Sequence, residues 1–339
     1  VNCIMIKGSS FTDTFIKLGV LIRDEHEYQS SPRGRLIKES LGIRFEIENP
    51  RDRLLYIPAR YMSLGYTIAE ALWYFLGNNE TDWISYYSNF WKSISDDGIT
   101  ANSAYGARIF KKHPRVRTSF GENVCQWTAC VRELIKDNDS RRAYIHIKSP
   151  LDNEDKLDVP CTIGMQFFIR DKKLHLLVNM RSSDLILGIT YDIPAFTLMQ
   201  EAMLLELQKH GLDVELGRYI HVSNSLHVYE QHFAMLDKIA ATTQSTFGAM
   251  AAMPGQGDWQ ALNNMQKSFR ADCESSTIDS EIANLGSYYS DWAQILRIHS
   301  RRVQLKATNK HDALATVLRA DIARLRSELT FEGYRFFKK

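Results

Sequence analysis

The sequence of 339 residues predicts an α/β fold, and two patterns lead to that prediction. Stretches of strand length, with alternating or continuous apolar residues, lie among longer stretches with apolar residues at helical spacing. The last part of the chain shows helical patterns alone. Hydrophobic residues make up 44% and charged residues 24%, which is the balance of an ordinary globular protein of one large or two small domains.

The first half of the chain is expected to contain both helices and strands. Within it, Glu70 lies among apolar neighbours on a helix, so burial should raise its pKa and suit it to proton transfer. In order, the elements are a helix over residues 12–22, a loop over 31–35, a strand over 43–47, a helix over 59–76, a helix over 126–136 and a strand over 143–147.

The second half is expected to begin with a β-hairpin, followed by a buried helix and a further strand. The hairpin turn is predicted at Asp171-Lys172-Lys173, and the helix stops before Gly211. These elements are strands over residues 161–170 and 174–180, a helix over 195–209 and a strand over 214–222. The sequence shows no internal repeats.

A loop rich in Met, Pro, Gly and Gln over residues 250–258 precedes helical patterns that are clearest over 308–329. We therefore expect one domain over residues 1–245 and a helical extension over 246–339, packed on the core or on a partner chain. Arg and Lys gather on one side of the last helical pattern. A solvated face explains this charge better than a nucleic-acid site does.

Net charge and the cysteines limit the function classes. The formal net charge is +2, so no strong field favours nucleic acid. No apolar run approaches the ~18 residues of a membrane span. The cysteines are odd in number and fit no zinc-binding spacing; Cys125 and Cys130 fit burial on a helix. We expect no metal, no membrane partner and a reducing, cytoplasmic location.

The stretch over residues 159–232 carries the chemistry. Cys161 follows Pro160 at the start of a predicted strand, and an ionised cysteine is a good soft nucleophile near neutral pH. Arg181 and Ser182 follow across the predicted hairpin, and they offer phosphate a planar fork of donors and a hydroxyl. A nucleophile beside an anion site indicates covalent chemistry on a phosphorylated substrate.

This stretch resembles the core of thymidylate synthase and of the related pyrimidine-nucleotide hydroxymethylases. The resemblance covers residues 30 to 235, and it rests on motifs that occur in the family's order. Upstream of the stretch, the helix around Glu70 and the turn that ends in Arg141 and Arg142 also match. The motifs within it are Pro160-Cys161, Gln166-Phe167, Arg181-Ser182-Ser183-Asp184, Leu187-Gly188, Tyr191-Asp192-Ile193 and His227-Val228-Tyr229.

The resemblance implies a fold and a reaction. The fold would be a twisted mixed sheet with helices on one face and a second copy of the chain on the other. In the reaction, Cys161 adds to C6 of a pyrimidine nucleotide, and C5 then accepts a one-carbon unit from 5,10-methylenetetrahydrofolate. Water would give a hydroxymethyl product, whereas hydride would give a methyl product.

The matching positions also imply roles for individual residues. Arg141 and Arg142 would reach the phosphate of the neighbouring chain, which makes the homodimer obligatory. A solvated turn is the plain alternative for this pair, as an exposed loop is for Arg33. The expected site comprises catalytic Cys161, Glu70, Tyr105 and Asp192; phosphate-binding Arg33, Arg181, Ser182, Arg141 and Arg142; Gln166, Asp192, His227 and Tyr229 at base and sugar; and Trp91, Asp184 and Gly188 at the folate.

The base is predicted from Asp192, where thymidylate synthases carry Asn. An ionised carboxylate only accepts hydrogen bonds, so it fits the 4-amino group of cytosine and stabilises a protonated N3. The alternative is that Asp192 caps the N-terminus of a helix. We expect cytidylate, either CMP or dCMP, because His227 and Tyr229 would hold a 3′-hydroxyl that both nucleotides carry.

Departures from the family bear on the product. Ile94 lies near the place of a second Trp, and the tail that seals the site during hydride transfer is missing. Both features favour entry of water and a hydroxymethyl product. A methylating enzyme for dUMP or dCMP is the nearest alternative. Thr162 replaces the His that follows the nucleophile in thymidylate synthases, which leaves open a nucleotide-binding protein without catalysis.

Overall fold

The structure is a computed structural model, and it describes residues 5–111, 123–152, 156–243, 247–309 and 312–337. The strands of these residues form one mixed sheet in the order β1-β3-β8-β6-β5-β4, with β2 added to β3 and β7 to β8. Their bounds are β1 Met5–Gly8, β2 Tyr28–Ser30, β3 Ile37–Ile47, β4 Tyr144–His146, β5 Thr162–Arg170, β6 Lys173–Met180, β7 Ser183–Asp184 and β8 Glu215–Tyr229. The predicted α/β fold is confirmed.

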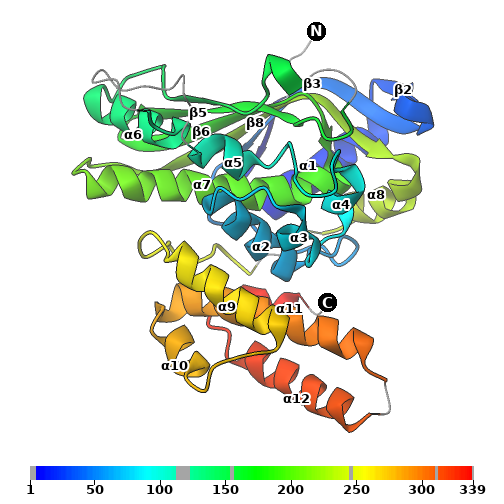
Figure 1. Ribbon diagram of the computed structural model, residues 1–339. Coiled ribbons are helices and arrows are strands. Elements are labelled where there is room, and N and C mark those ends of the chain that lie inside the picture. The colour runs from blue at the N-terminus through cyan, green and yellow to red at the C-terminus, as the bar shows by residue number, and fades with distance from the viewer. Residues whose placement is uncertain (1–4, 112–122, 153–155, 244–246, 310–311, 338–339) are drawn as a thin grey trace.

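The register of the sheet separates a covered face from an open face. Phe167, Leu176 and Tyr219 are neighbours on β5, β6 and β8, and all three are buried toward the helices. Successive residues of a strand point to opposite faces, so Leu177 and Ile220 lie on the other side. The helices lie on one side of the sheet (Figure 1). The apolar residues of the other side, which we call the open face, include Phe168, Leu177, Ile220 and Val222.

The helix α7 (Thr190–Lys209) lies at the centre of the molecule. It packs against β6 and β8 on one side and against α2 on the other. Its buried residues are distributed around the whole helix, as expected for a helix inside a core. The other helices of this part are α1 Phe11–Asp24, α2 Leu64–Phe75, α3 Thr81–Ser85, α4 Phe90–Ile94, α5 Tyr105–Phe110, α6 Gln126–Lys136 and α8 Phe233–Ala240. No helix of the described residues has both the length and the apolar character to cross a membrane.

Several element boundaries differ from the predictions; for example, β3 begins at Ile37 rather than at residue 43. The helix α2 begins at Leu64 because the Ser63 hydroxyl accepts a hydrogen bond from the Tyr66 amide and caps it. The helix α7 begins at Thr190, so Pro194 lies inside the helix rather than before it. The strand β8 continues to Tyr229, so His227 lies on a strand rather than after one.

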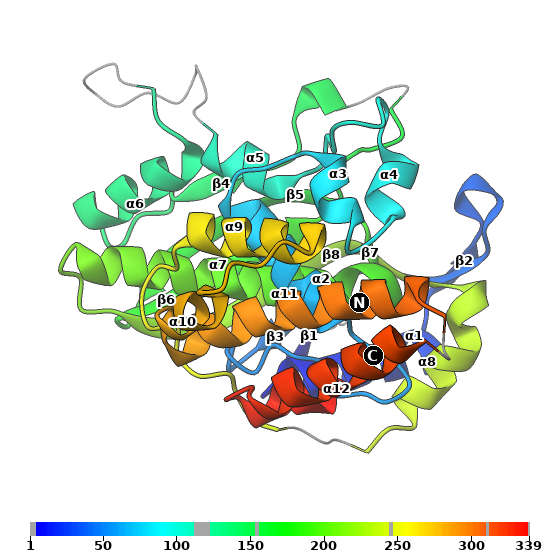
Figure 2. The same cartoon turned by 60° about the horizontal axis from the view of Figure 1, so that its bottom comes forward.

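The helical extension packs on its own chain, below α2 and α3 in Figure 1 and in front in Figure 2. Phe75 of α2 stacks on Trp259 with ring centroids 4.4 Å apart. The division of the chain into two parts stays a prediction, and its boundary at 245/246 lies outside the described residues. The helices of the extension are α9 Trp259–Ala271, α10 Ile278–Ala283, α11 Gly286–Ala307 and α12 Ala313–Ser327.

A buried ion cluster also ties the extension to the core. Glu201 of α7 accepts from Arg53 and Arg51 at 2.6 Å each, and from the Met253 amide at 3.0 Å. Arg53 and Glu201 are both almost fully buried. A buried charge is destabilising without its partner. The cluster therefore holds α7 against Arg51 and Arg53, which precede it in the sequence, and against Met253, which follows it.

Candidate active site

Cys161 lies where the chain enters β5, and the hairpin brings Arg181 back to it. The guanidinium of Arg181 donates to the carbonyls of Pro160 and Val159, both at 2.9 Å, and its Nη2 lies 3.7 Å from the Cys161 sulfur. The Arg181 amide also donates to the Cys161 carbonyl at 2.8 Å. Arg181 therefore holds the turn that presents the nucleophile, in addition to carrying a positive charge beside it.

The charges around Cys161 divide into two groups. Burial raises the pKa of the thiol; Arg181 lowers it, Asp192 and Asp158 raise it further, and Arg33 lowers it. The net direction is upward. Arg181 therefore favours the thiolate, but burial outweighs its charge.

Glu70 lies on α2 in a set of hydrogen bonds that we call the Glu70 network, comprising Trp91, Tyr66, Glu70 and Tyr74. The Trp91 indole donates to the Tyr66 hydroxyl at 3.0 Å, and Tyr66 donates to Glu70 Oε1 at 2.5 Å. Tyr74 donates to the same oxygen at 3.4 Å. Burial raises the pKa of Glu70 to about 7, against the lowering effect of the two tyrosines. The carboxyl can therefore take up or release a proton near neutral pH.

Asp192 lies in the first turn of α7, deep in the protein but partly accessible. Burial raises its pKa well above the ordinary value, and the charges of Glu70 and Asp184 raise it further. The capping alternative does not hold, because Ile189 occupies the N-cap of α7 and no side chain caps there. A Cβ at Gly188 would lie 3.2 Å from Asp192 Oδ2, so Gly188 leaves room for this carboxyl.

Asp184 begins the π-helix over Leu185–Ile189 that leads into α7. Its Oδ1 accepts from the amides of Ile186 and Leu187 at 2.8 and 3.0 Å. Its Oδ2 is buried and has no hydrogen-bond partner in the described part of the chain. Burial raises the pKa of Asp184, while the charges of His227 and His232 lower it. A buried oxygen left without a partner needs a donor, and the N–H groups of a pterin ring are such donors.

The folate residues therefore fit the cofactor that the resemblance implies. Asp184 offers the buried acceptor just described. Trp91 is buried, lies edge-on to Trp73 with centroids 4.9 Å apart, and belongs to the Glu70 network. Gly188 lies between Asp184 and Asp192 in the sequence and has no side chain.

Several other predicted residues join the same cluster. Tyr105 stacks between Tyr74 and Phe196, with centroids 5.4 and 5.8 Å away, and the charges of Asp192 and Cys161 act on its hydroxyl. His227 pairs in register with Asp184 across β7 and β8. Tyr229 lies edge-on to the His227 ring at 5.2 Å.

Arg33 lies on an exposed turn between β2 and β3, in the left-handed backbone region with φ 53°. Its charge lowers the pKa of Cys161. Glu39 holds this turn in place, because it accepts from Ser30 at 3.2 Å just before the turn, and also from Ser225 on β8.

Other predicted residues are not brought to Cys161. Gln166 lies beside Leu177 on the open face, and its amide donates to the Arg141 carbonyl at 2.7 Å. Arg141 and Arg142 are exposed, and neither forms an ion pair within the described residues. Ser182 is half-buried beside Arg181. The binding roles of these residues stay predictions.

Sequence reasoning missed some residues of the site. Tyr66 and Tyr74 lie four residues before and after Glu70, a helical spacing that could have indicated them. Asp158, whose charge acts on Cys161, accepts from the Ser103 amide at 2.8 Å, a contact between distant segments that no local pattern shows.

The sequence pattern of the thymidylate synthase family matches residues 20–266. The chain belongs to the thymidylate synthase family. The match reaches into α9 and so corrects the expectation that the resemblance ends near residue 235. Residues after 266, including α10, α11 and α12, lie beyond it.

Relatives and a solved structure agree with the family. The chain is 33% identical over 222 residues to the deoxyuridylate hydroxymethyltransferase of Bacillus phage SP01, covering 64% of this chain and 56% of that protein. It is 27% identical over 242 residues to the enzyme of the same name from Delftia phage PhiW-14, covering 67% and 63%. The chain thus spans less than two-thirds of these relatives.

The thermostable thymidylate synthase A from Bacillus subtilis has the same fold. It superposes with a TM-score of 0.57 over 70% of this chain and 86% of that chain, at 21% identity.

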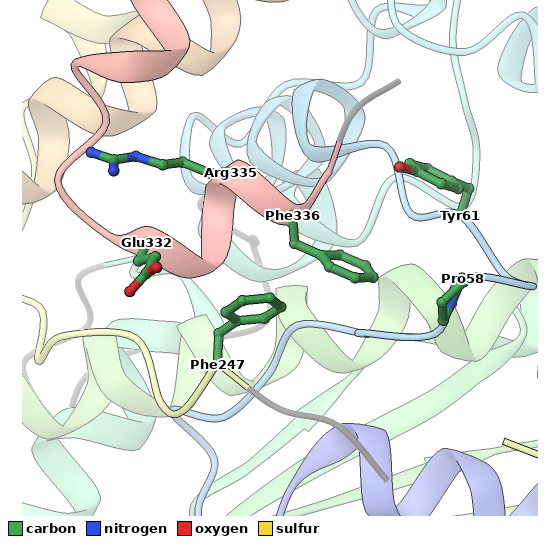
Figure 3. A pocket seen from close by; sticks show the side chains of 6 residues that line it. All are labelled: Pro58, Tyr61, Phe247, Glu332, Arg335 and Phe336. Atoms are coloured by element: carbon green, nitrogen blue, oxygen red, sulfur yellow. The ribbon is translucent and has the colours of Figure 1, made fainter. Parts of the chain in front are cut away.

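A hollow of about 450 Å³ between the extension and the core is separate from the site (Figure 3). It is lined by Pro58, Tyr61, Phe247, Glu332, Arg335 and Phe336, none of them a predicted site residue.

Proposed function

We propose that the chain is a folate-dependent 5-hydroxymethylase of a pyrimidine nucleotide, with cytidylate as its substrate. The observation that carries this proposal is the contact of Arg181 with Cys161, 3.7 Å from Nη2 to the sulfur, together with the charges of Arg33 and Asp192 that also act on the thiol. Arg181 and Arg33 suit the phosphate, and Asp192 suits the base. His227 pairs in register with Asp184, and Tyr229 contacts the His227 ring, so these two residues suit the sugar next to the folate.

Covalent addition is the first task of the site. The Cys161 sulfur forms a bond to C6, and the electrons of the C5–C6 double bond shift toward N3 of cytosine. Asp192, held protonated by burial and by its acidic neighbours, supplies the proton that N3 then takes. The Cys161 thiol releases its proton to solvent before the attack, and Arg181 stabilises the resulting negative charge on sulfur.

Water is the second reactant handled by the chain's own residues. 5,10-methylenetetrahydrofolate, when bound against Trp91 and Asp184, supplies the one-carbon unit. Glu70 has a pKa of about 7 and can take a proton from a water that adds to the methylene at C5. Tyr66 and Tyr74 hold the Glu70 carboxyl in one orientation for that transfer.

Deoxyuridylate is the second candidate substrate, and two observations favour it. Both phage relatives carry that substrate in their names. In addition, the sequence argument for cytosine assumed an ionised Asp192, whereas the raised pKa indicates a neutral carboxyl. A neutral carboxyl has one donor and one acceptor, so it can pair with the N3 and O4 of uracil as well as with cytosine.

Release of tritium from C5 of labelled CMP, dCMP and dUMP tests the proposal. We expect release that depends on methylenetetrahydrofolate and on Cys161, with Cys161→Ser as the control, and a hydroxymethyl product by mass spectrometry. Comparison of CMP with dCMP decides the sugar. No release from any of the three nucleotides would leave only a nucleotide-binding role.

Asp192→Asn separates the two bases. An amide cannot supply a proton to N3 of cytosine, so turnover on cytidylate should fall while turnover on deoxyuridylate survives or rises. Loss of a required polar partner can cost several orders of magnitude in discrimination. A variant that keeps cytidylate as its favoured substrate at near-native rate would contradict the role given to Asp192.

We also propose that the active form is a homodimer joined through the open face. Phe168, Leu177 and Val222 offer apolar area there, and the exposed Arg141 and Arg142 lie where this face ends. Mixed dimers of Arg142→Ala and Cys161→Ala chains should regain activity if the arginines act on the partner's phosphate. An active monomer in solution would contradict the shared site.

A further inference from the structure

The helical extension contacts the elements that carry the Glu70 network. The Trp83 indole of α3 donates to Asn263 of α9 at 2.9 Å, and the contact is buried. The Tyr87 hydroxyl donates to Gln266 of the same helix at 3.2 Å. The helix α3 packs in turn on α4, which carries Trp91. The extension thus supports Trp91 through one intervening helix.

The second contact lies on α2 itself. His299 of α11 rests against Gly65, where a Cβ would lie 2.6 Å from His299 Nδ1 and 2.9 Å from its Cβ. The imidazole is fixed from the other side, because Nε2 lies 3.3 Å from the Tyr86 carbonyl and the ring packs 4.6 Å from the Tyr87 ring. Gly65 precedes Tyr66 directly, so His299 packs against the backbone next to the residue that bonds Glu70.

We propose that α9 and α11 position the Glu70 network for catalysis, and that His299 is the positioning residue in this contact. The inference rests on the proposed function, since it gives the extension a part in the water step. The helix α11 lies beyond the family match, so this support is a feature that the chain adds to the shared fold.

The geometry distinguishes this role from general packing. The contact touches α2 at one end of the segment that holds both Tyr66 and Glu70, four residues apart. It touches no residue of the phosphate end, neither Arg181 nor Arg33. A displaced α2 should therefore impair proton transfer and leave nucleotide binding intact.

Substitutions at both sides of the contact test the proposal in the full chain. We expect His299→Ala to lower kcat by about tenfold to a hundredfold, the loss that a small misplacement of a catalytic group produces. The dissociation constant for the nucleotide should not change. Gly65→Ala should act in the same way, because its Cβ enters the space of His299.

The double variant supplies the decisive comparison. His299→Ala vacates the space that the Gly65→Ala methyl needs, so the pair should be more active than the product of the single effects predicts. His299→Gln keeps a donor for the Tyr86 carbonyl and should recover part of kcat. Asp291→Asn is the control, since Asp291 binds Thr330 and Phe331 inside the extension and should change stability alone.

The pH profile adds a measurement that loss of stability would not move. Tyr66 lowers the pKa of Glu70, so a displaced Tyr66 should shift the Glu70 limb of kcat to higher pH. Tyr74 near the opposite end of α2, Tyr105 on α5 and Asp192 on α7 also interact with Glu70, but only Tyr66 is next to Gly65 in the chain. The shift should therefore come from Tyr66.

Two results would overturn the inference. One is a folded His299→Ala variant with native kcat and an unmoved pH limb. The other is an equal effect from Asp291→Asn. Amide hydrogen exchange of residues 64–75 and 90–94 reports on the contact independently of activity, and its rate should rise in His299→Ala. If the wild type proves inactive on every nucleotide, this measurement still decides whether the extension holds α2 and α4.

Discussion

Glu70→Gln should stabilise the protein at pH 8 while it abolishes turnover. Burial raises the pKa of Glu70 from 4.5 to about 7, although hydrogen bonds from Tyr66 and Tyr74 lower it. The folded state therefore binds the proton more tightly than the unfolded chain does. Stability linked to this group is present at acid pH, and it is lost as the pH rises from 4.5 through about 7.

The magnitude follows from the two pKa values. Each pH unit between them corresponds to about 1.4 kcal/mol, so the ionised carboxyl costs the folded state about 3 kcal/mol at pH 8. Gln carries no charge, and its carbonyl can still accept the Tyr66 hydrogen bond. We expect the free energy of unfolding of Glu70→Gln to exceed that of the wild type by up to about 3 kcal/mol at pH 8.

Urea denaturation at pH 4.5 and pH 8, followed by tryptophan fluorescence, measures this difference. The two proteins should have equal stability at the lower pH and diverge at the higher one. Glu48→Gln is the matched control, because the Glu48 side chain is exposed. Equal stability of Glu70→Gln and wild type at pH 8 would show that Glu70 ionises normally and would remove the basis for its role in proton transfer.

Three further substitutions test other parts of the site. Arg181→Ala should raise KM for the nucleotide and lower kcat in steady-state assays, because it removes both the phosphate ligand and the bonds to the turn before the nucleophile. Gly188→Ala should lower kcat without unfolding the protein, since its Cβ lies 3.2 Å from Asp192 Oδ2; unchanged kinetics would contradict this. Glu201→Gln should lower the free energy of unfolding by about 3–5 kcal/mol, because Arg53 is left buried without its partner.

The fold was largely predictable because its elements are long and strongly patterned. The hairpin of β5 and β6 and the helix α6 have the predicted bounds within a residue or two. The strands β2 and β7 were missed, since two or three residues carry no period, and each exists only by pairing with a longer strand. The π-helix before α7 was also missed, because its 5 residues are too few to show a helical spacing.

The residues of the candidate site were easier to predict from the sequence than their ionisation. Motif order named Cys161, Glu70 and Asp192, but it could not give their ionisation. The raised pKa of Asp192 depends on Glu70 from α2 and Asp184 from β7, two segments that only the folded chain brings together. The side-chain contact of Gln166 with Arg141 was missed for the same reason.

The distribution of charge around Cys161 gives the substrate an orientation. Burial, Asp192 and Asp158 raise the pKa of the thiol, whereas Arg181 and Arg33 lower it. A nucleotide has the complementary polarity, with a dianionic phosphate at one end and a base that gains a proton at the other. Burial and the charges of Glu70 and Asp184 raise the pKa of Asp192, which disfavours a second negative charge near Glu70. Exchange of the two ends would set phosphate against carboxyl, so we expect the proposed nucleotide to bind with its phosphate at the arginines and its base at Asp192.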